Sequence, residues 1–264
     1  MRVIKKWLFV LLLALSQPLL ADVINVPLHY VGPTEGSVWM GVQQGLEEAN
    51  VQGEFLGQKY TIEVVTTQDL LSLEHATAIL LATDDQHILG IAESEKFANV
   101  PVFNLVSDSD VLRSACIPNL LSIPASQKMK KDALAQWLAE NPNSTAHVQG
   151  WHEDFKKFAA SQLNNRFKRS HGVVMDNDAW SGWAAVKLLA DTVARTNSTD
   201  AAVMLKYLKN DITFDGQKGA SSTFRDTGQL RQLLLLVDDN KIVAEAPLRG
   251  AKGGLDSLGL KSCK

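Results

Sequence analysis

Apolar strand-like segments alternate with segments of helical periodicity between residues 22 and 106, and this alternation constrains the fold more than any other feature. The strand-like segments are apolar or rich in β-branched residues, and they cover residues 22–31, 60–65, 77–82 and 100–106. A helix that begins at Ser37 and another near 87–98 lie between them. Strands separated by helices form a parallel sheet with helices on both faces, so we expect an α/β fold.

Helices predominate beyond residue 106. The expected elements are a loop (107–126), an amphipathic helix (127–140), a polar linker (141–150) and three helices marked by apolar stripes at 155–167, 183–193 and 201–208. The chain then ends in a predicted hairpin, in which the Asp-Asp-Asn turn of residues 238–240 joins two apolar strands.

The N-terminus is typical of a cleavable secretory signal. Arg2, Lys5 and Lys6 precede the apolar run WLFVLLLAL, and the segment ends at a small residue, Ala21, as a cleavage site requires. The run is short for a membrane span, which favours cleavage after Ala21 over the alternative, a retained anchor. The net charge of −3 comes without a basic block, which argues against nucleic-acid binding.

The chain has two cysteines, Cys116 and Cys263. An oxidising compartment favours a disulfide between them, which would tie the C-terminal tail to the middle of the chain. Two free thiols are the alternative.

The stretch VGPTEGS (31–37) forms a tight turn between the first predicted strand and the first helix. It lacks the lysine of a phosphate loop and the glycine spacing of a dinucleotide loop. The free N–H groups at the start of the helix still favour an anionic or carbonyl group of a ligand, so Thr34 and Glu35 are candidate ligand-binding residues. The alternative is an ordinary helix start, capped by Thr34 or Ser37.

Hydroxyl and carboxylate side chains follow two further predicted strands. Ligands of open α/β sheets bind beyond the carboxyl ends of the strands. We therefore expect a rim that binds a small polar ligand, an ammonium group or a cation, with the candidates Asp84, Asp85, Ser107 and Asp108. The alternative is that these residues cap the helices that follow them.

Enzyme motifs are incomplete. WHEDFKK has Lys156 where a zinc motif needs its second histidine, DNDAWSG has Trp180 where a calcium loop needs an oxygen ligand, and no G-x-S-x-G motif occurs. We therefore predict that the protein is not an enzyme and holds no metal or cofactor. Trp180 and Trp183 could stack on a ligand, although their helical spacing places at least one of them in the core.

Several stretches resemble the type I periplasmic solute-binding proteins of the branched-chain amino acid kind: residues 26–65, VPVFNLVSDSDVLRSACIPNLLSIPAS, residues 177–210 and FRDTGQLRQLLLLVDDNKIV. YVGPTEGSVWMGVQQGL, RSACIPNLL and GQLRQ further resemble the subfamily associated with PQQ-dependent alcohol dehydrogenase systems in Gram-negative bacteria. The first-lobe ligand residues of the family carry over to Thr34, Asp85, Ser107 and Asp108.

The resemblance implies a type I periplasmic-binding-protein-like fold, in which a parallel sheet with flanking helices is followed by a second lobe. Here only NPNSTAHVQG separates two predicted helices where about three βα units are expected, so the second lobe is predicted to be reduced and mostly helical. The implied divisions are a signal peptide (1–21), a first lobe (22–126), a reduced second part (127–220) and a C-terminal hairpin and tail (221–264).

The resemblance also implies a function. The protein would be the periplasmic solute-binding component of an ABC transporter, linked to a PQQ-dependent alcohol oxidation system, and would bind a small polar ligand non-covalently. Its partners would be the solute and a transporter permease or a periplasmic PQQ-dependent dehydrogenase, with no nucleic acid and no membrane span after signal cleavage. The alternative is a degenerate binding-protein fold that acts as an interaction or maturation factor for a periplasmic dehydrogenase.

Overall fold

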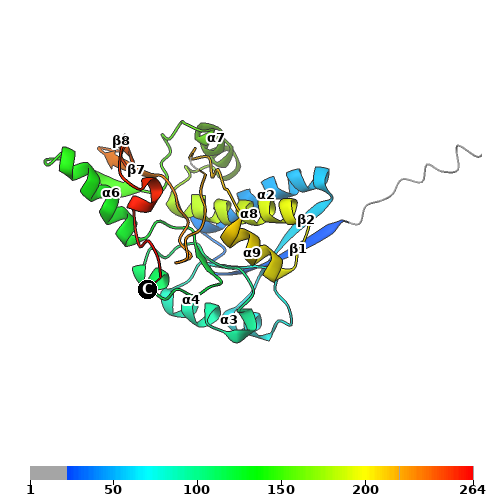
Figure 1. Ribbon diagram of the computed structural model, residues 1–264. Helices are drawn as coiled ribbons and strands as arrows, with labels where there is room; N and C mark the ends of the chain where they lie inside the picture. Colours follow the sequence, from blue (N-terminus) through cyan, green and yellow to red (C-terminus); the bar gives the residue numbers. More distant parts are fainter. Residues whose placement is uncertain (1–22, 220, 264) are drawn as a thin grey trace, which may run out of the picture.

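The computed structural model describes residues 23–219 and 221–263, which form two sheets with helices packed against them (Figure 1). Within these residues the larger sheet has five parallel strands in the order β2-β1-β3-β4-β5. They are β1 (Ile24–Val31), β2 (Gln58–Val64), β3 (Ile79–Leu81), β4 (Val102–Asn104) and β5 (Leu120–Ser122). The predicted α/β fold with a parallel sheet is therefore confirmed. The predicted signal segment, 1–21, lies outside the described residues.

Helices cover both faces of the larger sheet (Figure 1). On one face Val26, Leu28 and Tyr30 pack in a core with α2 (Ser37–Leu56), α8 (Asn177–Thr196) and α9 (Ala201–Asn210). On the other face Ile79 and Leu81 pack with α3 (Thr67–Ser72), α4 (Asp85–Ala92) and α5 (Asp110–Ser114). Strands buried on both faces read as continuous apolar runs, which explains the sequence of β3.

Helices α2 and α8 approach each other closely because glycines line their contact. A Cβ atom added at Gly41 would lie 1.9 Å from the carbonyl oxygen of Ala179, and one added at Gly182 would lie 2.3 Å from that of Val38. No real Cβ atom tolerates such distances, so both positions require glycine. Helix α8 thus packs on the larger sheet, although it follows the second part of the chain in sequence.

The second sheet described is antiparallel, in the order β6-β7-β8, with strands β6 (His147–Gln149), β7 (Leu234–Asp238) and β8 (Lys241–Ala246). Helix α6 (Gln127–Glu140) packs Met129 and Ala133 against Leu234 and Leu236. The predicted hairpin is confirmed. Asp239 and Asn240 have φ values of 50° and 56°, the left-handed conformation that a two-residue hairpin turn needs.

Some predicted elements were wrong in detail. The segment 107–126 is not one loop, since it contains α5 and β5, and the linker 141–150 contains β6. The helix predicted near 87–98 is α4 followed by a short 3₁₀ helix, Glu95–Phe97, and α7 (Ala160–His171) begins after the first residues of its predicted stripe. The strands β5 and β6 are each three residues long, and pairing with neighbouring strands rather than local sequence fixes them.

The division of the chain at residues 126 and 220 stays a prediction. The observed packing bears on it, because α8 and α9 belong to the core of the larger sheet, whereas α6, β6 and the hairpin share a smaller core. The chain therefore leaves the larger sheet after β5, and it returns to the core of that sheet at Trp151, Phe155 and α7, ahead of α8 and α9.

The C-terminal tail connects the two parts. Leu258 packs in the core beneath α6, and the N–H of Gly259 donates to Asp132 Oδ2 at 2.7 Å. Cys263 then forms a disulfide with Cys116, which follows α5. The predicted disulfide is confirmed over the alternative of free thiols. No helix in the described part of the chain has the length and apolar character needed to cross a membrane.

Candidate functional site

Polar side chains from the ends of β3 and β4 meet at the carboxyl edge of the larger sheet. Ser107, in the loop after β4, donates a hydrogen bond from its hydroxyl to the Asp85 carboxylate at the start of α4. Asn104, the last residue of β4, folds this loop: its Oδ1 accepts from the N–H of Ser107 at 2.9 Å, and its Nδ2 donates to the Ser107 carbonyl at 2.8 Å. The expected contact between two strand ends is therefore present.

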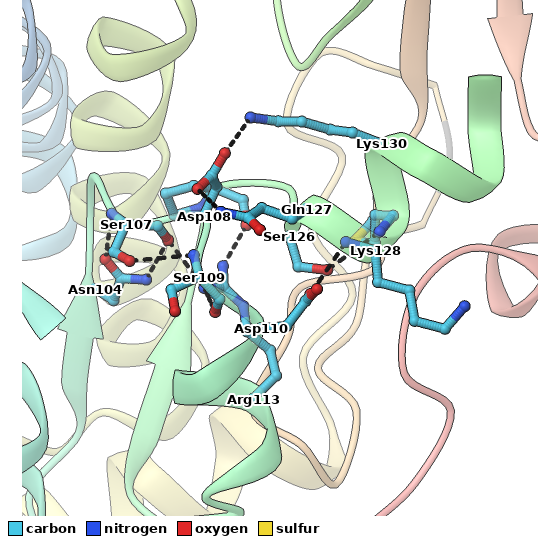
Figure 2. Close-up of polar contacts among 12 residues, drawn as sticks. Asn104, Ser107, Asp108, Ser109, Asp110, Arg113, Ser126, Gln127, Lys128 and Lys130 are labelled. Atoms are coloured by element: carbon cyan, nitrogen blue, oxygen red, sulfur yellow. Dashed lines mark hydrogen bonds and ion pairs between the residues drawn. The ribbon is translucent and has the colours of Figure 1, made fainter.

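Arg113 lies beneath this loop and is 1% exposed. Its guanidinium donates to the carbonyls of Ser107 and Ser109, at 2.9 and 2.8 Å (Figure 2). It also donates to the Pro124 carbonyl and to Gln229 Oε1, both at 2.7 Å. Burial lowers the pKa of Arg113 to about 10, against the opposing effect of nearby carboxylates, so the group stays charged at neutral pH. No sequence motif points to Arg113. Its guanidinium fixes the backbone of the rim.

Asp108 connects the rim to α6 (Figure 2). Its carboxylate accepts from Lys130 Nζ at 2.8 Å and from Gln127 Nε2 at 3.2 Å, and its carbonyl accepts from the Gln127 N–H. Partial burial alone raises the pKa of Asp108, but the hydrogen bonds from Lys130 and Gln127 outweigh it and leave the pKa below its usual value. This ion pair spans the two parts of the chain.

A pocket of about 320 Å³ opens beside this ion pair. Its walls come from the loop after β4, the segment after β5, helix α6, the start of α8 and two single residues near β6 and β7. They include Asp108, Lys130, Gly150, Asp178, Trp180 and Gln232. The pocket therefore lies where the carboxyl edge of the larger sheet faces the second part of the chain. Its volume suits a small molecule.

Asp178 adds a second carboxylate to the wall. Partial burial, and then the charges of Asp176 and Asp108, raise the pKa of Asp178, while Lys130 lowers it. The residue is nevertheless exposed as a whole, and solvent screens these effects. We conclude that the wall carries two carboxylates and the ammonium group of Lys130, and so favours a polar ligand.

Trp180 and Trp183 are both buried. Trp180 lines the pocket, stacks on Trp151 with ring centroids 6.0 Å apart, and donates from Nε1 to the Gly216 carbonyl at 3.1 Å. Trp183 donates to Glu48 and lies in the core between α2 and α8, so at least one of the two is a core residue as predicted.

The remaining predicted site residues lie away from the pocket wall. Asp84 caps α4, accepting from the N–H of His87 at 3.0 Å and contacting its ring, and the hydrogen bond from this N–H is the main cause that lowers the pKa of Asp84. Thr34 and Glu35 are exposed in the turn before α2. The cap of α2 is Gly36 with no side-chain hydrogen bond, so the alternative of a cap by Thr34 or Ser37 is wrong.

Ser109, two residues after Ser107, also caps a helix. Its hydroxyl accepts a hydrogen bond from the N–H of Val111 at 3.3 Å at the start of α5. The structure thus brings Asp85, Ser107 and Asp108 together, whereas Asp84 has a capping role. Sequence reasoning missed Lys130, Gly150, Asp178 and Gln232, because they come from segments far apart in the chain. Asp108 and Trp180 are the two wall residues that the sequence had indicated.

Three solved structures illustrate what this fold is similar to. A branched-chain amino acid ABC transporter periplasmic ligand-binding protein from Burkholderia xenovorans LB400 matches at a TM-score of 0.72 and 12% identity, over 88% of this chain and 96% of that one. A leucine-binding protein from Thermotoga maritima matches at 0.66 and 11% identity, over 83% and 98% of the two chains. An ABC transporter solute-binding protein from R. palustris, in complex with benzoate, matches at 0.67 and 11% identity, over 92% and 98%.

No protein-family model matches the chain, and no curated protein matches it in sequence. At 12% identity or less, the structural matches show the fold alone. The fold is that of the type I periplasmic binding proteins, as the residues quoted from the sequence led us to expect.

Proposed function

We propose that this protein is the periplasmic solute-binding component of an ABC transporter. The observation that carries the proposal is the polar pocket between the carboxyl edge of the larger sheet and α6, since open α/β sheets bind ligands at that edge. The fold supports it too, because the similar structures described above are ABC transporter binding proteins.

Binding would be non-covalent. Asp108, Asp178 and Lys130 offer charged contacts to a small polar solute, and Trp180 offers an apolar surface. Asp85 and Ser107 would act through the loop that carries Asp108, while Thr34, Glu35 and Asp84 stay proposed ligand contacts that movement of the two parts would have to bring closer. Closure of the two parts over the solute would remove it from water.

The proposal includes a link to PQQ-dependent alcohol oxidation. Its support is the resemblance of YVGPTEGSVWMGVQQGL, RSACIPNLL and GQLRQ to the subfamily associated with those systems. These residues form the end of β1 with the turn and the first half of α2, the segment around Cys116 up to β5, and the segment before β7.

A thermal-shift screen of the mature protein against amino acids, short alcohols, aldehydes, PQQ and metal ions tests the proposal. A solute present at 100 times its dissociation constant should stabilise the protein by about 2.7 kcal/mol. The double variant Asp108→Asn/Asp178→Asn should lose the shift, and the exposed control Asp226→Asn should keep it. Retention of the full shift in the double variant would exclude this pocket as the site.

An open groove favours the second candidate function, an interaction or maturation factor for a periplasmic dehydrogenase. The groove, of about 680 Å³, runs along β8 and includes Phe155, Lys157 and the exposed Val243. If no solute shifts the unfolding midpoint while affinity capture retrieves a dehydrogenase subunit, and Val243→Asp abolishes that capture, this candidate replaces the first.

A further inference from the structure

Lys218 is a buried lysine with no acidic partner. It is 1% exposed and lies in the turn that follows α9, at residues 215–219. Its Nζ donates to Gln232 Oε1 at 2.6 Å, lies 3.4 Å from the Leu233 carbonyl oxygen and sits 3.6 Å from the centre of the Trp180 ring. Among the described residues no carboxylate pairs with it. Burying an unpaired charge is costly, so such a group calls for a functional explanation.

The ammonium group lies directly behind the wall of the pocket. Gln232 and Trp180, which hold Lys218, both line the pocket. The third neighbour is Gly150, also a wall residue: the position that a Cβ atom would take there is 3.3 Å from Asn177 Oδ1, 3.8 Å from Gln232 Oε1 and 4.0 Å from Lys218 Nζ. Because residue 150 is glycine, no side chain fills this position in front of the ammonium group.

The neighbours of Lys218 are held in place. Gln232 is 1% exposed, and its Nε2 donates to the Ile123 carbonyl at 2.6 Å, which turns its Oε1 toward Lys218. Trp180 is fixed by its stacking on Trp151 and by its hydrogen bond to Gly216. Lys218 therefore cannot reach out to water, and what it lacks is a negative charge from the pocket side. Burial accordingly lowers the pKa of Lys218 well below its usual value.

We propose that Lys218 is the anion-recognising residue of the pocket, and that the solute carries a carboxylate that docks at Gly150 against its ammonium group. This inference rests on the proposed function and deepens it, because it names the chemical class of the solute. Elsewhere in the pocket wall Asp108 already occupies Lys130, and Asp178 adds a further negative charge, so the anionic group of the solute is directed to Lys218.

The test compares sodium butyrate, n-butylamine hydrochloride and n-butanol as probes of equal chain length, at equal ionic strength against sodium chloride. We expect butyrate to raise the unfolding midpoint of the full mature protein more than chloride does. The response should disappear in Lys218→Met, which keeps the length of the apolar stem and removes the charge. It should also fall in Gly150→Ala, which keeps Lys218 but fills the docking position.

Lys130→Met serves as the comparison variant, because Lys130 is the other lysine of the pocket. A wild-type protein that responds no more to butyrate than to chloride overturns the inference, and so does loss of the butyrate response in Lys130→Met with retention in Lys218→Met. If butylamine or butanol stabilises the protein while butyrate does not, the solute-binding function stands and the role of Lys218 falls. If no probe and no solute of the screen binds, both fall.

To separate binding from folding, the unfolding midpoint of Lys218→Met is measured without any probe. Lys218→Met removes a costly buried charge but also takes the donor from Gln232 Oε1, so the two effects oppose each other and the midpoint should change little. A folded Lys218→Met protein that binds butyrate as tightly as the wild type contradicts the inference directly.

Discussion

Arg113 has four hydrogen-bond acceptors around a side chain that is 1% exposed. Three of them are backbone carbonyls of the loop after β4 and of the segment after β5. A buried acceptor that loses its donor costs about 1–3 kcal/mol, so the stability of this rim depends on one guanidinium group.

Arg113→Met should therefore lower the free energy of unfolding by about 3 kcal/mol or more, because several buried carbonyls lose their donor together. Urea denaturation followed by circular dichroism measures the change. Arg169→Met, at an exposed arginine on α7, is the matched control and should stay within about 0.5 kcal/mol of the wild type. An Arg113→Met protein with wild-type stability would show that the carbonyls are satisfied by water instead.

The ion pair of Asp108 and Lys130 makes a pH-dependent contribution to the free energy of unfolding. Its hydrogen-bonded form holds the pKa of Asp108 below the ordinary value of 3.8, so the stabilisation is present above that pH and is lost as the pH falls through the folded-state pKa. The side chains are 38% and 37% exposed, so we expect at most about 1 kcal/mol.

Asp108→Asn should consequently be less stable than the wild type at pH 7, and the two proteins should converge below pH 3.8. Urea unfolding at pH 7 and at low pH measures the difference, with Lys130→Met as a second way to break the same pair. A difference that does not change with pH would mean that the pair contributes nothing through its charge.

Whether a contact could be predicted from the sequence depends on how its two residues are placed in the chain. Asp85 and Ser107 could be predicted to meet because parallel strands end at one edge of a sheet, a rule that needs local sequence alone. The contacts of Asp108 with Lys130, and of Lys218 with Gln232, depend on how α6 and the last part of the chain pack. No local pattern encodes that packing.

At the level of helices and strands, the contact between α2 and α8 decides which elements belong to the larger sheet. Gly41 and Gly182 allow this contact, and each places its Cα against a backbone carbonyl of the opposite helix. Helix propensity favours alanine over glycine by about 1 kcal/mol, so packing here outweighs propensity.

Gly41→Ala and Gly182→Ala should each lower the free energy of unfolding by about 1–3 kcal/mol, because the added methyl group forces the helices apart. Gly90→Ala is the control, since Gly90 lies in α4 with no other atoms within 4 Å of an added Cβ. It should raise stability by about 0.5–1 kcal/mol. Thermal and urea denaturation of the three variants provide the comparison, and equal effects in all three would refute the role of close packing.

Long periodic helices and the terminal hairpin could be predicted from the sequence, whereas β5 and β6 could not. Each of these two strands has three residues, too few for a periodicity of two to stand out from a loop. Their strand conformation comes from pairing with β4 and β7, which is a property of the assembled sheets.

For the whole molecule, the disulfide between Cys116 and Cys263 closes a sequence separation of 147 residues. A cross-link over so long a loop removes much of the conformational freedom of the unfolded chain, by about 4–5 kcal/mol in the chain-entropy model.

The double variant Cys116→Ser/Cys263→Ser should therefore unfold at a lower urea concentration, with a loss of about 3–5 kcal/mol. A reducing agent should destabilise the wild type to the same level and leave the double variant unaffected. Equal stability of the oxidised and reduced wild type would contradict a stabilising role.

The path of the chain has a consequence for any attempt to dissect the protein. The chain builds the larger sheet first, moves to α6 and β6, and comes back for α7, α8 and α9. It leaves again for the hairpin before Cys263 ties the tail to Cys116, between α5 and β5. No contiguous fragment contains one half complete without part of the other, and a truncation after β5 would strip α8 from an apolar sheet face. Both halves must therefore fold together, and a nascent polypeptide cannot finish one of them until most of its length has been synthesised.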